Sequence, residues 1–260
     1  MTGSASRIRV ERDGAVATVL LDRAEKKNAL DRAMADALRS ALDELAAVDD
    51  VRVVVLRGAG PDFCAGADLE ALERLLDAGA DAHRDDARAL GDVFLALRAM
   101  PQPVVAAVHG RALAGGAGLA TACDIVLAHE GAQFGYPEVR IGFVPAMVMT
   151  MLRRAVGEKQ AFDLVATGRV IGAEEAHRIG LVSRVLPAST FGAGVASIAE
   201  GLAGSPPGAM ALTKRLFYEL DALDFTDGVA AGVRFNVEAR STAEFREGLR
   251  RFLARRKGEA

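Results

Sequence analysis

Short apolar segments and longer amphipathic segments alternate along the first part of the chain. Residues 15–21 alternate apolar side chains before a turn, which is typical of a β-strand. The continuous apolar run at residues 53–56 predicts a strand buried on both faces, and residues 104–108 and 125–128 are also strand-like. Apolar residues at helical spacing predict a helix over residues 31–48. This alternation indicates an α/β protein with layered strands and helices.

Two further segments continue the pattern before the middle of the chain. Residues 62–68, with the sequence DFCAGAD, predict a turn built of small residues. The polar stretch at residues 69–100 predicts helix, and it stops before Pro101 and Pro103.

The pattern changes after Thr190, where the sequence predicts helices and no strands. Ser205 followed by Pro206 is typical of a helix N-cap with proline at the first helical position. Ser241 and Glu244 have the spacing of a capping box at the start of a last helix.

The last helix carries an apolar stripe that must be buried on the core or on a neighbouring subunit. The stripe consists of Phe245, Leu249, Phe252 and Leu253. We expect the cations around it to form a solvated face suited to a helix C-terminus, rather than a phosphate site; they are Arg246, Arg250, Arg251, Arg255, Arg256 and Lys257. We therefore predict a core at residues 1–195 and a helical C-terminal region at residues 196–260.

A glycine-rich segment between two strand-like runs is the strongest candidate for chemistry. Gly115 and Gly116 leave their backbone N–H groups accessible to a ligand. If a helix starts near Gly115, its first N–H groups lack intrahelical partners, and the helix dipole favours negative charge there. Such donors can stabilise an oxyanion, although small residues would equally suit a helix packed closely on a strand.

The residues of the glycine-rich turn exclude three other known motifs. A dinucleotide fingerprint needs Gly or Ala where this chain has Thr121, counting from Gly116. A P-loop needs a lysine after its glycines, and a nucleophile elbow needs a serine between them. The segment contains neither.

Composition narrows the classes of function. The chain has 260 residues and a net charge of −3, which offers no electrostatic case for nucleic acid. Residues 1–7 do not resemble a signal peptide, and no apolar run is long enough to span a bilayer. Cys64 and Cys123 are expected to be reduced thiols in a cytoplasmic protein. Scattered histidines and cysteines make a metal site unexpected.

An ordered set of motifs resembles the crotonase superfamily, the enoyl-CoA hydratase/isomerase family. They are RAEKKNAL at 23–30, DFCAGAD followed by Leu69, AAVHG at 106–110, AGGAGLA at 114–120, Cys123-Asp124, Pro137-Glu138 and GLV at 180–182. Each motif is short, but together they keep the family's order over nearly the whole chain. The resemblance implies a spiral of ββα turns and a helical C-terminal region that mediates trimerisation, often as a dimer of trimers.

The resemblance also implies a site for an acyl-CoA substrate. The family's oxyanion hole is made of two backbone N–H groups, which fall on Ala67 and Gly115 and would hold the thioester oxygen. Coenzyme A belongs to the substrate, so no separate cofactor is expected. The implied substrate-binding positions are Lys26, Lys27, Ala29, Ala65, Asp68, Gly116 and Gly118.

The sequence departs from the family's two-acid pattern. Where two-acid hydratases carry their first glutamate, this chain has Gly118, and where some isomerases carry an aspartate it has Ala146. Glu138 is the acid that remains at these positions. One carboxylate can move a proton from C2 to C4, which favours Δ3–Δ2 enoyl-CoA isomerisation. A one-glutamate hydratase and a coenzyme A-binding pseudo-enzyme remain the alternatives. We expect the apolar side chains of Ile141, Phe143 and Val144 to desolvate Glu138 and raise its pKa.

Overall fold

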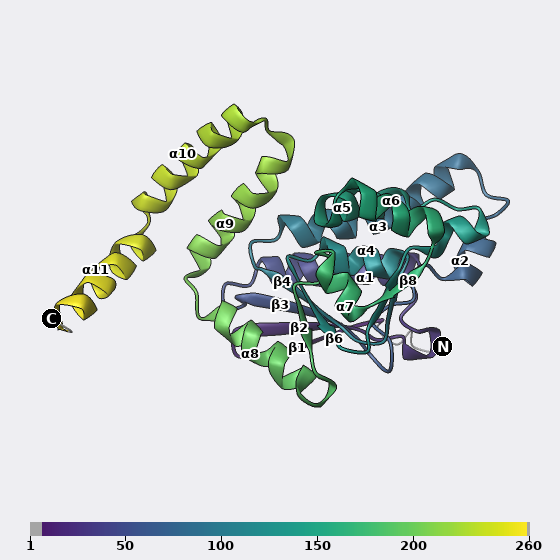
Figure 1. Cartoon of the computed structure of the whole chain (residues 1–260), viewed down its shortest axis with the longest axis horizontal. Coiled ribbons are helices and arrows are strands. Elements are labelled where there is room, and N and C mark those ends of the chain that lie inside the picture. The colour runs from purple at the N-terminus through teal and green to yellow at the C-terminus, as the bar shows by residue number, and fades with distance from the viewer. Residues whose placement is uncertain (1–6, 259–260) are drawn as a thin grey trace.

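The computed structural model describes residues 7–258 and shows strands at the centre with helices packed around them (Figure 1). The strands are β1 (Ile8–Asp13), β2 (Val16–Leu21), β3 (Val53–Gly58), β4 (Val104–Val108), β5 (Arg111–Leu113), β6 (Ile125–His129), β7 (Gln133–Gly135), β8 (Val170–Gly172) and β9 (Arg184–Leu186). The α-helices are α1 (Arg32–Ala46), α2 (Leu69–Glu73), α3 (Ala80–Ala99), α4 (Gly115–Ala122), α5 (Ala146–Val156), α6 (Glu158–Thr167), α7 (Ala173–Arg178), α8 (Phe191–Ala203), α9 (Pro207–Glu219), α10 (Phe225–Ser241) and α11 (Ala243–Gly258). Short 3-10 turns are η1 (Ala24–Lys26), η2 (Pro137–Ile141), η3 (Ala188–Thr190) and η4 (Leu220–Ala222).

The larger sheet has the strand order β1-β2-β3-β4-β6-β9. All of its pairs are parallel except the β1–β2 hairpin, which turns at Gly14 with φ of +53°. The predicted strands at residues 15–21, 53–56, 104–108 and 125–128 are confirmed, with ends that differ by one or two residues. A smaller sheet has the order β5-β7-β8.

The central strand β3 shows why its sequence is apolar without alternation. Val54 and Leu56 point into the main core, which also contains α1, α3 and α4. Val53 and Val55 point to the other face and pack under α8. Because both faces are covered, every residue from 53 to 56 is buried, as the sequence predicted.

The first long helix begins where its capping residue predicts. The Asp31 carboxylate accepts a hydrogen bond from the N–H of Met34 at 2.9 Å, which satisfies a free donor of the first turn. Helix α1 then ends at Ala46, close to the predicted end. The polar stretch at residues 69–100 is broken, in contrast, into α2 and α3 by residues 74–79.

The C-terminal region is helical, as predicted, but two caps differ from the expected ones. Helix α9 starts at Pro207, one residue later than predicted, and Ser205 does not cap it. The Thr242 hydroxyl, not Ser241, accepts a hydrogen bond from Phe245 N–H at the start of α11. Glu244 instead reaches the start of α9, because free N–H groups and the helix dipole attract a carboxylate there.

Helices α9, α10 and α11 form an arm that extends away from the sheets (Figure 1). The predicted boundary at residue 195 falls inside α8, which packs on the large sheet; the division into two domains stays a prediction. Within residues 7–258, no helix combines the length and the apolar character needed to cross a membrane.

A buried lysine connects the arm to the core through hydrogen bonds and an ion pair. Lys214 of α9 is 7% exposed, and its Nζ donates to the carbonyl oxygens of Leu97 at 2.7 Å and Gln102 at 2.9 Å. It also pairs with Asp124 at 2.7 Å, whose other carboxylate oxygen accepts from Tyr218 Oη at 2.7 Å. Burial lowers the pKa of Lys214, while Asp124 opposes that shift. The lysine thus links α3, the loop before β4 and the start of β6 to α9.

Replacing Lys214 by Met should destabilise the fold strongly. The substitution leaves the Asp124 carboxylate without its cation and two carbonyls without a donor, a loss of about 3–5 kcal/mol for a broken buried pair. Urea unfolding followed by circular dichroism measures the change. Arg84→Met is the matched control, since the exposed Arg84–Asp81 pair should contribute less than about 1 kcal/mol. Equal effects of the two variants would contradict this role for Lys214.

Candidate active site

The loop at residues 62–68 and the start of α4 are held against one another through β5. Cys64 N–H donates to the Arg111 carbonyl, and Leu113 N–H donates to the Cys64 carbonyl, each at 3.0 Å. A Cβ on Gly116 would lie 2.2 Å from the Cys64 carbonyl oxygen. Only glycine therefore permits this approach of helix and loop.

The residues that join these segments have unusual backbone conformations. Ala114, just before α4, has φ of +48°, and its N–H donates to the Gly135 carbonyl at 2.8 Å. Gly66 has φ of +100°, and a Cβ there would lie 2.8 Å from the Cβ of Ala114. Non-glycine residues rarely adopt positive φ, and such strain often accompanies functional sites.

This contact brings the two predicted oxyanion positions, Ala67 and Gly115, into neighbouring turns. Leu30 binds the backbone on either side of Ala67: its N–H donates to Gly66 at 2.7 Å and its carbonyl accepts from Asp68 at 2.8 Å. In an extended segment the intervening N–H then points the opposite way. Among the hydrogen bonds of residues 7–258, none uses the N–H of Ala67 or of Gly115.

Helix α4 adds a favourable field at the same point. It spans eight residues and begins at Gly115, where the positive end of its dipole lies. Seven of these residues are buried, so water is largely excluded around the helix. Free N–H groups in such surroundings can stabilise an oxygen that gains negative charge.

Glu138 differs from the other buried carboxylates of the described chain. It lies in η2, is 9% exposed, and its Oε2 is buried without a hydrogen-bond partner. Burial is the main reason that its pKa is raised. The buried carboxylates Asp62 and Asp68, by contrast, pair with Arg111 at 2.8 Å and with Arg23 at 2.6 Å.

The expected cause of this desolvation is only partly right. Ile141, Phe143 and Val144 are 68%, 57% and 50% exposed, so at least half of each residue faces solvent. Within this segment the chain closes a turn, because Phe143 N–H donates to the backbone carbonyl of Glu138 at 3.0 Å and Gly142 adopts a φ of +75°.

A hydrogen bond that the sequence analysis missed ties η2 to α4. Tyr136 is fully buried, and its hydroxyl lies 3.0 Å from the Thr121 hydroxyl, which donates in turn to the Ala117 carbonyl at 2.7 Å. This link positions the segment before Glu138 on the helix that starts at Gly115. The tyrosine two residues before the acid was the available signal, since a tyrosine hydroxyl needs a partner when it is buried.

Gly118 is not an open position in the site. A Cβ there would lie 2.3 Å from Cγ1 of Val148 and 3.1 Å from Cζ of Phe94. Val148 belongs to α5 and is 4% exposed. The space next to Gly118 is therefore filled by an apolar side chain, a feature that no sequence spacing indicated.

The predicted coenzyme A positions lie on two adjoining segments: Lys26, Lys27 and Ala29 on one, and Ala65 and Asp68 on the loop at residues 62–68. Residues 27 and 28 both have positive φ, and the Lys27 carbonyl accepts from Ala65 N–H at 3.0 Å. Buried Asn28, which the sequence analysis did not single out, donates to the carbonyls of Ala59 and Asp62 at 2.9 and 2.8 Å.

The side chains at these predicted positions differ in whether they already have partners. Lys26 pairs with Glu70 at the surface. Asp68 is committed to Arg23 and to the N-terminus of α2, where it accepts from Glu70 and Ala71 N–H. Ala29 is buried beside Leu30, so any contact from Ala29 is made by its backbone. Among the described residues, no cluster of three side chains suits a metal ion.

Glu138→Gln should make the protein more stable at neutral pH. The pKa of Glu138 is raised in the fold, so its stabilising contribution is present when it is protonated and is lost as pH rises through the raised pKa. Glutamine keeps the shape without the buried charge. We expect a higher Tm than wild type at pH 7, with a gain that shrinks as pH falls toward the usual carboxyl range. A Tm difference that is independent of pH would argue against a strained, ionised Glu138.

Gly118→Glu alone should destabilise the protein, because its Cβ overlaps Val148 and overpacking costs about 1–3 kcal/mol. The double variant Gly118→Glu, Val148→Gly should recover part of that loss, since it removes the overlapping methyl groups. Thermal melts of both variants and of Val148→Gly alone provide the comparison. If the single variant is as stable as wild type, the packing around Gly118 is looser than the structure indicates.

Comparison with known proteins agrees with this arrangement over almost the whole chain. Residues 11–259 match the family model described as enoyl-CoA hydratase/isomerase. A Thermus thermophilus protein, provisionally named an enoyl-CoA hydratase, is 44% identical over 96% of this chain and 98% of its own length.

Solved structures extend the likeness to three dimensions. The crystal structure of an enoyl-CoA hydratase from Mycobacterium smegmatis superposes with a TM-score of 0.92, at 32% identity over 96% of both chains. An enoyl-CoA hydratase from Bacillus anthracis gives 0.90, at 31% identity and the same coverage. The resemblance seen in the sequence motifs is therefore confirmed, with its α/β fold of the crotonase type, and this chain belongs to the enoyl-CoA hydratase/isomerase family.

Proposed function

We propose that this protein is an acyl-CoA enzyme that stabilises a thioester enolate and moves a proton with Glu138. The N–H groups of Ala67 and Gly115 hold the thioester oxygen as it gains negative charge. The observation that carries the proposal is the buried carboxylate of Glu138, whose Oε2 has no hydrogen-bond partner. The segment before Glu138 is joined through Tyr136 and Thr121 to helix α4, which begins with the free N–H of Gly115. A carboxylate in that state is ready to accept a proton, because burial has raised its pKa.

The reaction best suited to one carboxylate is Δ3–Δ2 enoyl-CoA isomerisation. Glu138 takes a proton from C2, the electron pair enters the thioester carbonyl, and the oxyanion donors stabilise the enolate. The same protonated carboxyl then returns the proton at C4, and the double bond comes to lie between C2 and C3. No second acid is required, and Val148 fills the space beside Gly118.

Hydration of a 2-enoyl-CoA is the second candidate. The names of the relatives favour it, since they are given as enoyl-CoA hydratases. Hydration needs a water molecule activated at C3 and a proton delivered at C2, so with one glutamate another group must orient the water. The third candidate is a protein that binds coenzyme A but catalyses no reaction. The presence of Glu138 argues against this candidate.

Coenzyme A would follow the two adjoining loops. Lys26 and Lys27 supply cations suited to phosphates, and the backbone of Ala29 and Ala65 borders the same path. Asp68 contributes by fixing Arg23 and α2. Gly116 and Gly118 contribute because they have no side chain. A side chain at Gly116 would clash with Cys64, and one at Gly118 would clash with Val148.

Glu138→Gln should lower turnover by roughly two to four orders of magnitude, because the amide cannot accept the C2 proton. Wild type and variant are assayed side by side on a 3-enoyl-CoA and a 2-trans-enoyl-CoA, and coenzyme A binding, expected to be unchanged, serves as the control. Wild type should act faster on the 3-enoyl substrate. If hydration is at least tenfold faster, about 1.4 kcal/mol in barrier height, the protein is a one-glutamate hydratase. No turnover of either substrate would favour the binding-protein alternative.

We further propose that the chain assembles as a homotrimer or a dimer of trimers through its arm. Phe225 of α10 is 87% exposed, and the predicted stripe on α11 is also exposed, with Phe245 at 44% and Phe252 at 59%. Apolar surface of this extent on a protruding arm is typical of an interface between subunits.

Deleting residues 242–260 should cause dissociation or aggregation, which light scattering detects. Because the deletion also removes the Glu244 cap of α9, a full-length variant with Leu249→Glu and Phe252→Glu gives a cleaner test. Arg250→Glu, on the polar side of α11, is its control. A stripe variant that keeps the wild-type mass in solution would show that another surface makes the main contact.

A further inference from the structure

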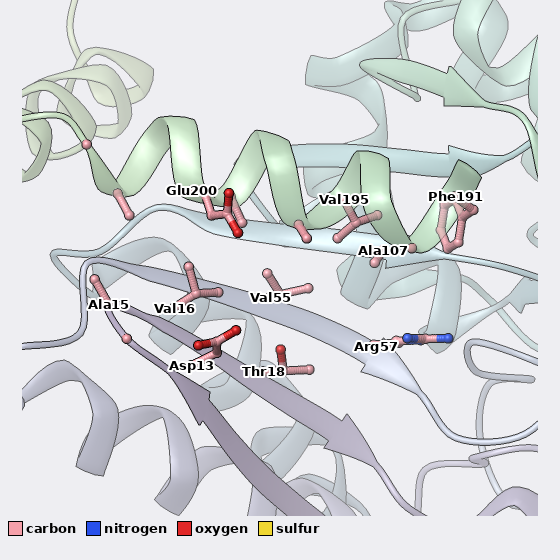
Figure 2. Close-up of a pocket in the computed structure, with 16 residues that line it drawn as sticks. Asp13, Ala15, Val16, Thr18, Val55, Arg57, Ala107, Phe191, Val195 and Glu200 are labelled. Carbon is pink, nitrogen blue, oxygen red and sulfur yellow. The ribbon is translucent and has the colours of Figure 1, made fainter.

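A cavity lies between the large sheet and α8, on the face of the sheet opposite the candidate active site. Its volume is about 580 Å³, within the range of small-molecule sites, which is roughly 300–1,000 Å³. The floor is formed by side chains of β2, β3 and β4, including Val16, Val55 and Ala107, and the other wall by α8, including Phe191 and Val195 (Figure 2).

The sheet separates this groove from the acyl-CoA site. Alternate residues of β3 point to opposite faces: Val55 faces α8 and the groove, whereas Val54 and Leu56 face the core that contains α4. A molecule in the groove therefore cannot touch Gly115 or Glu138. A ligand in the groove is thus separate from the reacting part of the acyl-CoA substrate.

Charged side chains make one end of the groove negative and the other end positive. Asp13 comes from the sheet side and Glu200 from α8, and Figure 2 shows both carboxylates at the same end. Arg57 lies toward the opposite end on the sheet side, across the groove from Phe191 of α8. Within residues 7–258, none of these three side chains makes an ion pair or a hydrogen bond.

The register of the strands sets the distance between the two ends. Asp13 pairs with Val16, Val16 pairs with Val53, and Arg57 lies four residues further along the same strand. At ~3.3 Å per residue the separation is about 13 Å. The stretch between them is lined mainly by apolar side chains, with the Thr18 hydroxyl near the acidic end.

We propose that this groove binds a monocationic amphiphile, that is, an organic ammonium compound with one apolar chain. The ammonium group lies between Asp13 and Glu200, two exposed carboxylates that have no cation of their own among the described residues. It can also donate to the Thr18 hydroxyl. The chain lies along Val55, Val195 and Phe191, where its burial provides the hydrophobic contribution.

The unpaired cation at the far end selects against other ligands. Arg57 repels a second positive charge, so a diamine or polyamine is disfavoured. An alkyl carboxylate could place its head group at Arg57, but it would then leave Asp13 and Glu200 without a cation. The two carboxylates from opposite walls therefore make the ammonium compound the preferred occupant.

Isothermal titration calorimetry with octylammonium, below its micelle-forming concentration, tests the proposal on the full chain. We expect binding to wild type and at least tenfold weaker binding to the Asp13→Asn, Glu200→Gln double variant. Ala196→Phe, which fills the groove from its exposed side, should abolish binding. Arg57→Gln is the matched control and should bind octylammonium at least as well as wild type.

Three results would overturn the proposal. They are equal affinity for octanoate and octylammonium, binding that the double variant leaves unchanged, and no binding at millimolar octylammonium. If Ala196→Phe breaks the assembly by light scattering while neither probe binds, the groove is an interface between copies instead. Turnover of the double variant should equal that of wild type, and added coenzyme A should not displace octylammonium, because the groove and the acyl-CoA site lie on opposite faces of the sheet.

Discussion

The close approach of α4 to the loop at residues 62–68 is the constraint on which the candidate site depends. Helix and loop can meet only because Gly66 and Gly116 carry no side chain, and because Ala114 accepts a positive φ between β5 and α4. The approach places two turns with unused N–H groups beside one another. It also fixes where the positive end of the helix dipole lies. A single methyl group at Gly116 would separate the two segments, since it would meet backbone rather than a movable side chain.

Near that contact, the carboxylates fall into two groups: those with a cationic partner and one without. Buried Asp62 and Asp68 and half-buried Asp124 each have a cationic partner, and they hold loops, a helix start and the arm in place. Among the described residues, Glu138 forms no ion pair, and burial raises its pKa. The paired carboxylates contribute to the fold, whereas the unpaired one lowers stability and suits proton transfer. Such a local loss of stability is a common feature of catalytic sites.

The two faces of the large sheet have separate surroundings. One face supports α4 and the candidate active site, and the other supports α8 and a groove with charged ends. The parallel strands make this division possible, because each alternates its side chains between two covered faces. The arm then adds apolar surface that the single chain leaves exposed.

The sequence by itself determined the order of elements and the family. Apolar runs such as residues 53–56 and the helix over 31–48 are local patterns, and the ordered motifs from residue 23 to residue 182 identified the crotonase type, which the comparisons confirmed. Ala67, Gly115 and Glu138 were also named from those motifs, and their roles stay predictions. Local signals were weaker at helix ends, where Ser205 and Ser241 proved not to be caps.

Only the tertiary structure decided which distant groups meet. Glu244 caps a helix that starts 37 residues earlier, at Pro207, because α11 packs beside α9. Val148 fills the space beside Gly118, and Thr121 bonds to Tyr136, through contacts between segments that are separate in sequence. The burial of Glu138, and the groove between Asp13 and Glu200, likewise arise when the chain folds back on itself. The spacing of apolar residues along the chain determines which helices and strands form. The burial of a side chain and its hydrogen-bond or ion-pair partners depend on residues that are distant in sequence, and only folding brings these together.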